Sequence, residues 1–68
     1  MYLQPVSSSN IDSIGYENNT LYVRFHHGGT YAYYGVPQHI YEGLMKAASH
    51  GEYLAKHVKN NYKYSKIG

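Results

Sequence analysis

Five histidines are the side chains of this sequence that could serve as acids, bases or metal ligands. His26 and His27 are neighbours where a predicted strand meets a turn, so their rings are expected to point apart. His50 and His57 are seven positions apart, whereas helical zinc sites place two histidines four positions apart. The chain offers only four acidic residues and no cysteine to complete a metal shell. We therefore expect no metal, no cofactor and no catalytic residue.

Tyrosines and lysines are the other side chains that could bind a ligand. The chain has 10 tyrosines, one phenylalanine and no tryptophan among 68 residues. Because aliphatic side chains are few, most of these rings are expected in the core, with their hydroxyls bonded or wet. The net charge is +2, and four lysines follow Glu52 without any acidic residue: Lys56, Lys59, Lys63 and Lys66. Lysines interleaved with aromatic rings attract phosphates and offer faces on which bases can stack.

Length and hydropathy narrow the class of protein. No apolar run approaches the roughly 20 residues that span a bilayer. The segment from Met1 to Pro5 lacks the basic start and the apolar stretch of a signal peptide. Without cysteine there is no disulfide framework. We expect one cytoplasmic domain over residues 1–68, with no membrane partner and with residues 1–9 as a loose lead-in.

Alternating hydrophobic residues predict three consecutive strands joined by two short turns. The predicted strands span residues 11–16, 21–26 and 30–35. Asn18 and Asn19 suit the first turn, because asparagine tolerates a positive φ. The second turn is predicted to have three residues, His27, Gly28 and Gly29. The three strands therefore form an antiparallel meander.

The second turn determines which residues of its two strands lie opposite each other. The expected pairs are Phe25 with Tyr31, Val23 with Tyr33, Leu21 with Gly35, Tyr22 with Tyr34, Arg24 with Ala32 and His26 with Thr30. Because opposed residues share a face, Tyr31 and Tyr33 are expected in the core. Tyr22, Arg24 and Tyr34 are expected on the opposite, exposed face.

Helical spacing follows the third strand. A first helix is predicted to start at Pro37, and Gly43 within it is expected to allow close packing. Ser49 and Glu52 form a capping-box pattern that starts a second helix. The residues expected to face the sheet are Ile40, Tyr41, Leu44 and Ala48 in the first helix and Tyr53, Leu54, His57 and Val58 in the second. Residues 62–67 alternate briefly, as a short edge strand or an extended tail. The predicted class is α+β, with both helices packed on one face of the sheet.

The ordered motifs of this chain resemble the KTSC domain over nearly its entire length. The matching segments are Val6-Ser7-Ser8-Ser9-x-Ile11, Ile14-Gly15-Tyr16, Leu21-x-Val23-x-Phe25, Gly29-x-Tyr31-x-Tyr33, Val36-Pro37, Tyr41, Leu44, Ala48-Ser49-x-Gly51 and Tyr62-x-Tyr64. The family's central Y-x-Y motif falls on Tyr31 and Tyr33. This domain occurs alone in small bacterial proteins and at the C-terminus of some lysyl-tRNA synthetases, and that context implies RNA as a partner.

The function predicted from the sequence is a small, non-catalytic module that binds single-stranded RNA. Tyr22 and Tyr34 would stack bases, Arg24 would contact a phosphate, and the four C-terminal lysines would supply attraction that weakens with salt. The alternative is a protein-interaction or dimerisation module that uses the same sheet face, because tyrosine and arginine are also favoured at protein interfaces. A third possibility is a nuclease with His26 or His27 as its base.

Overall fold

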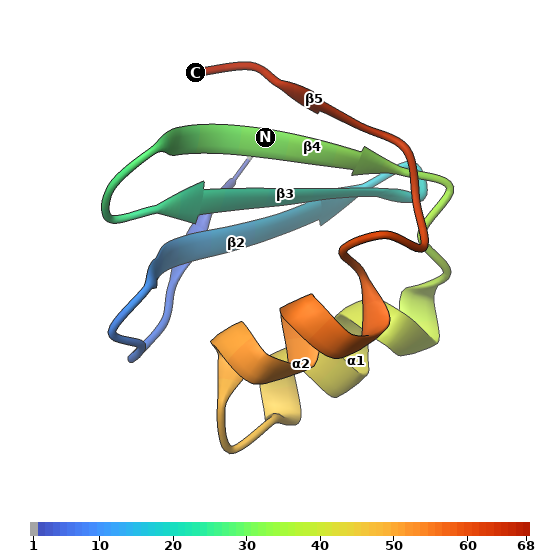
Figure 1. Ribbon diagram of the computed structural model, residues 1–68. Helices are drawn as coiled ribbons and strands as arrows, with labels where there is room; N and C mark the ends of the chain where they lie inside the picture. The colour runs from blue at the N-terminus through green and yellow to red at the C-terminus, as the bar shows by residue number, and fades with distance from the viewer. Residues whose placement is uncertain (1) are drawn as a thin grey trace.

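A five-stranded antiparallel sheet and two helices make up the α+β fold of the computed structural model, which describes residues 2–68 (Figure 1). The elements are β1 (Gln4–Pro5), β2 (Ile11–Glu17), β3 (Thr20–Phe25), β4 (Gly29–Tyr34), α1 (Gln38–Lys46), α2 (His50–His57) and β5 (Tyr64–Lys66). The strands neighbour one another in chain order. The predicted meander, the two helices and the short C-terminal strand are confirmed. The lead-in, however, is not wholly irregular, because Gln4 and Pro5 pair with Ile14 and Ser13 at the edge of the sheet.

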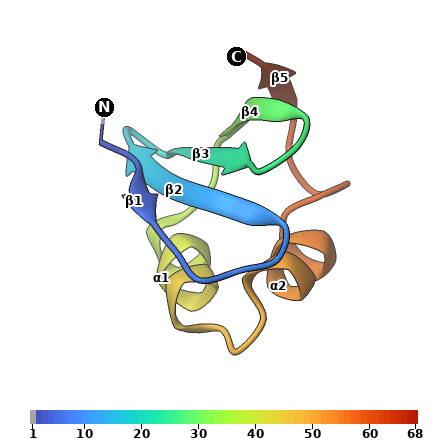
Figure 2. The same ribbon diagram turned by 90° about the vertical axis from the view of Figure 1, so that its left-hand side faces the viewer.

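Both helices lie on the same side of the sheet. Figure 2 shows α1 and α2 beneath β2, with β4 and β5 farther from the helices. We call the sheet face turned toward the helices the inner face and the opposite one the outer face. The two helices therefore cover one part of the inner face and leave the part under β4 and β5 less covered.

The turns explain both the success and the error of the predicted pairing. Asn18 and Asn19 take positive φ values of 52° and 60° between β2 and β3, as predicted. The next turn also has three residues, but it starts one residue early, so that Phe25 pairs with Gly29. Gly28 and Gly29 both have positive φ, so Gly29 ends the turn and also begins β4. The predicted pairs of β3 and β4 are thus shifted by two residues.

A shift of two residues changes the partners of each side chain but not its face. Tyr33 lies opposite Leu21, and Tyr31 lies opposite Val23. Since side chains alternate with a period of two, Tyr31 and Tyr33 still share the inner face with Leu21 and Val23. The predicted sidedness of these strands is therefore correct, although the predicted pairs are wrong.

A bulge in β2 places two isoleucines in the core that simple alternation would put on opposite faces. Ile11 pairs with Phe25 and Ser13 with Arg24, so the register shifts at Asp12. Ile11 and Ile14, three positions apart, are both fully buried as a result. The bulge thus doubles the aliphatic contribution of β2 to the core.

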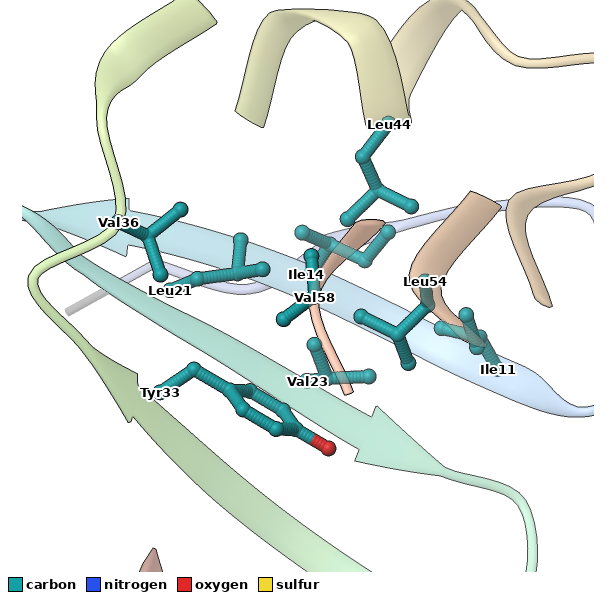
Figure 3. Packing of buried hydrophobic residues seen from close by; sticks show 9 residues of the cluster. All are labelled: Ile11, Ile14, Leu21, Val23, Tyr33, Val36, Leu44, Leu54 and Val58. Atoms are coloured by element: carbon teal, nitrogen blue, oxygen red, sulfur yellow. The ribbon is translucent and has the colours of Figure 1, made fainter. Parts of the chain in front are cut away.

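The core is aliphatic at its centre and tyrosine-rich at its margin. Its fully buried large side chains are Ile11, Ile14, Leu21, Val23, Val36, Leu44, Leu54 and Val58. Figure 3 shows the Tyr33 ring lying along β3 at the margin of this cluster, with its hydroxyl directed away from Val36. Tyr16 seals another margin, because its ring stacks on Tyr41 at 4.8 Å and its hydroxyl donates to the Val36 carbonyl at 2.5 Å. These rings bury their faces while their hydroxyls remain bonded or wet.

The helix boundaries depend on the residues predicted to start them. Pro37 precedes α1 as its N-cap, and the Pro37 carbonyl accepts a hydrogen bond from the Ile40 N–H at 3.1 Å. Ser49 caps α2 through its hydroxyl, which accepts from the Glu52 N–H at 3.2 Å. Two of the predicted inward residues are exposed, in contrast to the prediction. Ala48 lies beyond the end of α1, and His57 stacks on the Tyr53 ring at the surface of α2.

Gly43 permits the close contact between α1 and α2. A Cβ at position 43 would collide with the Tyr53 hydroxyl and would lie 2.8 Å from the Cζ atom of that ring. Gly43 therefore fits as predicted, because any larger residue would push the Tyr53 ring away from α1.

We expect Gly43→Ala to stabilise the chain by about 1 kcal/mol in a Tyr53→Leu background, because alanine there gains helix propensity without meeting the tyrosine ring. With Tyr53 present we expect no stabilisation, because the new Cβ collides with that ring. Urea unfolding of the two single variants and the double variant measures this coupling. An equal effect of Gly43→Ala in both backgrounds would show that the contact is unimportant.

We also expect Ser49→Ala to lower the free energy of unfolding by about 1 kcal/mol, because the Glu52 N–H loses its acceptor. Ser9→Ala, at an exposed serine outside both helices, is the control and should stay within about 0.5 kcal/mol. The same urea experiment would refute the cap if both substitutions had the same effect.

Candidate functional site

A groove of about 410 Å³ opens on the inner face, between the strands and the segment that follows α2. Its lining residues are Asn10, Phe25, His27, Gly28, Tyr31, Tyr33, Lys59, Asn60 and Tyr64. The four rings come from three adjacent strands, β3, β4 and β5. We call this feature the aromatic groove and define it by Phe25, Tyr31, Tyr33, Tyr64 and Lys59.

Strand alternation brings the tyrosines of the aromatic groove together. Tyr31 and Tyr33 are two positions apart in β4, and Tyr64 in β5 lies directly opposite Tyr33. The ring centroid of Tyr64 is 5.7 Å from each of the other two. Phe25 meets Tyr31 edge-on, with centroids also 5.7 Å apart and planes at 79°. The rings therefore contact one another in sequence and form one continuous aromatic wall.

The wall has a buried end and an exposed end. Tyr33 is only 4% exposed, whereas Tyr64 is 60% exposed. Burial raises the pKa of the Tyr33 hydroxyl above its usual 10.0, and the neighbouring Tyr31 and Tyr64 raise it further. The Tyr33 hydroxyl is therefore neutral at physiological pH and can both donate and accept a hydrogen bond.

Two lysines stand beside the aromatic wall. The Lys59 ammonium lies 5.5 Å from the centroid of the Phe25 ring, within the range of a cation–π contact. Lys66 pairs with Tyr31 and so shares the inner face, and its Cε atom would lie 3.1 Å from a Cβ at Gly29. A Cβ at Gly29 would collide first with the Gly68 carbonyl, so glycine at this position leaves room for the Gly68 backbone and beside it for the Lys66 stem. Lys59 thus lines the groove itself, and the Lys66 side chain lies next to Gly29, the neighbour of the lining residue Gly28.

The residues predicted to stack bases lie on the other side of the sheet. Tyr22 pairs with Ala32, and Tyr34 pairs with Thr20, so the two tyrosines are diagonal neighbours and not opposed as predicted. Tyr22 is half-buried and Tyr34 is 44% exposed. Arg24 is exposed opposite Thr30 and not opposite Ala32. These three side chains form the outer face, as predicted, with different partners.

The structure does not gather the predicted site onto one surface. Lys59 and Lys66 lie on the inner side with the aromatic groove, across the sheet from Tyr22 and Arg24. Lys56 is exposed on α2, and Lys63 precedes β5, where its carbonyl accepts from the Tyr34 N–H at 2.8 Å. The predicted site thus combines residues from two faces of the sheet. The signal that could have identified part of the groove is the shared odd parity of Phe25, Tyr31 and Tyr33, whereas Tyr64 joins them only through the register of β5 against β4.

The histidines are separated by the fold. His26 faces the N-terminal segment, with Nε2 at 3.0 Å from the Ser8 carbonyl oxygen and Nδ1 at 3.7 Å from an Asp12 carboxylate oxygen. His27 lines the aromatic groove. His50 is bound through Nδ1 to the Leu44 carbonyl at 2.8 Å. Within residues 2–68, no three histidine or acidic side chains lie close enough together to hold a metal ion. In the same part of the chain, neither helix is long and apolar enough to cross a membrane.

Comparison with known proteins places this architecture in a family. The family model described as the KTSC domain matches residues 7–62. A protein of Tsukamurella paurometabola, with no function in its name, is 38% identical over 63 residues, which cover 90% of this chain and 94% of that protein. The crystal structure of a KTSC domain protein from Yersinia pestis is similar with a TM-score of 0.96 and 42% identity, over 98% of this chain and 97% of that one. The chain therefore belongs to the KTSC domain family.

Proposed function

We propose that this chain is a non-catalytic module that binds single-stranded RNA, and that its bases stack in the aromatic groove. The observation that carries the proposal is the placement of an open aromatic wall beside the Lys59 ammonium, with the Lys66 side chain next to Gly29 on the same face of the sheet. Within residues 2–68, no aspartate or glutamate lines the groove. A ligand that combines a flat ring with negative charge matches this surface, and a nucleotide is such a ligand.

The expected energetics agree with a weak, salt-sensitive interaction. Stacking of a base on an aromatic side chain contributes about 1–3 kcal/mol. Each lysine that neutralises a phosphate releases a counterion, so the affinity falls as salt rises. Lys56 and Lys63 add positive charge to the same half of the chain and increase the rate of encounter.

The outer face supports the same function less well. Tyr34 is exposed, but Tyr22 is half-buried, and Tyr22 lies diagonal to Tyr34. Arg24 lies on this face, whereas Lys59 lines the groove and Lys66 pairs with Tyr31 on the inner face. The groove combines four aromatic rings with the Lys59 side chain in one lining, and we therefore propose it as the RNA site.

Two exposed tyrosines on opposite sides of the sheet allow a matched test. We expect Tyr64→Ala to weaken binding of a fluorescently labelled, unstructured RNA of about 12 nucleotides by fivefold or more, because one stacking surface is lost. Tyr34→Ala removes the same side chain from the outer face and should change the affinity less than twofold, within about 0.4 kcal/mol. Fluorescence anisotropy at about 50 and about 200 mM salt measures both variants.

The outcomes separate the candidate functions. Absence of RNA binding by the wild-type chain at low salt would refute the function, and a loss confined to Tyr34→Ala would move the site to the outer face. A sedimentation coefficient that rises with protein concentration, without RNA binding, would instead support the interaction or dimerisation module.

A further inference from the structure

We infer that the aromatic groove accepts a single unstacked nucleotide. The base of this nucleotide stacks on the aromatic wall, and its 5′ and 3′ phosphates contact Lys59 and Lys66. This inference rests on the proposed function, and it specifies the unit of RNA that the site recognises. The spacing of the rings, the size of the groove and the position of the two lysines support it.

The spacing of the rings limits the number of bases. A base stacked on a ring lies about 3.5 Å from it, so a base inserted between two rings needs a separation of about 7 Å. The centroids of Tyr31 and Tyr33 are 6.5 Å apart, and those of Tyr31 and Tyr64 are 5.7 Å apart. These rings already contact one another and leave no slot between them. The wall therefore offers one continuous face, at its exposed end on Tyr64, to one base.

The size of the groove also indicates a single nucleotide. Its volume of about 410 Å³ is near the lower end of the roughly 300–1,000 Å³ found for small-molecule sites. This volume suits one nucleotide and not a run of stacked bases. A base in a duplex has both faces covered by its neighbours, so the ligand must be an unpaired nucleotide.

The two lysines match the two phosphates that flank a nucleotide within a strand. Lys59 enters the groove from the segment after α2 and lies over Phe25, whereas Lys66 extends from β5 across Gly29. The positive φ of 72° at Asn60 turns the chain sharply just after Lys59. Two cations therefore approach one aromatic wall from different elements. Asn10 and Asn60 add amide groups at the rim that can form hydrogen bonds with base or ribose.

An RNA strand with bases at chosen positions tests the inference directly. The probes are three labelled ribose-phosphate chains of equal length, each about seven units, the first with a base at every unit, the second with a base only at the centre, and the third with no base. We expect the one-base chain to bind within about sevenfold of the fully based chain, since the latter merely offers seven equivalent registers. The chain without bases should bind at least fivefold more weakly than the one-base chain.

Charge variants test the two phosphate contacts. Lys59→Met and Lys66→Met should each reduce the slope of log affinity against log salt by about 0.7 for the one-base chain, because each removes one phosphate contact. Lys46→Met changes the net charge equally from an exposed position at the end of α1 outside the groove, and should leave the slope unchanged. Circular dichroism confirms that each variant remains folded.

Failure of this inference differs from failure of the proposed function. A fully based chain that binds far more than about sevenfold tighter than the one-base chain would show a multi-base site and overturn the inference while RNA binding stands. Equal slopes for all three lysine variants would also overturn it. If the fully based chain does not bind at all, both proposals are wrong.

Discussion

The inner face of the sheet is larger than its helical cover, and this mismatch organises the molecule. The helices have nine and eight residues and are therefore only about 12–13 Å long. Aliphatic side chains fill the region that the helices cover, and aromatic side chains occupy the region where the cover ends. Tyrosine suits this boundary, because its ring can be buried while its hydroxyl stays in contact with water. The groove exists because the sheet continues past α2 as β4 and β5.

Much of the fold follows from local sequence. The asparagine pair at 18 and 19 and the N-cap at Ser49 act through short-range geometry, and both were identifiable from residue type and spacing. The register of β3 against β4 could not be identified from the sequence, because either of two adjacent three-residue turns keeps the apolar side chains on one face. The bulge at Asp12 and the pairing of Gln4 and Pro5 depend on contacts between segments, which alternation alone does not specify.

The candidate site was harder to predict than the fold. Exposed lysines and tyrosines can be counted from sequence, but the face on which each lies depends on the register of β5 against β4. Tyr31 and Tyr33 do contribute to the core, as expected, and they also form the wall of an open groove. A tyrosine such as Tyr33 can thus pack its ring into the core while the tyrosine opposite it on the next strand, Tyr64, remains accessible. A division into buried and exposed residues conceals this dual role.

The outermost strands have a consequence for how the chain avoids self-assembly. Thr30–Tyr34 is an uncharged, proline-free segment rich in tyrosine, the kind of sequence that forms cross-β fibrils when it lies at a bare sheet edge. In this fold β3 and β5 pair with it on both sides. The edges that remain are short, with Pro5 lacking an N–H on one side and Lys66 carrying charge on the other. The last strand thereby protects the chain against polymerisation, since its detachment would leave the Thr30–Tyr34 segment at a bare sheet edge.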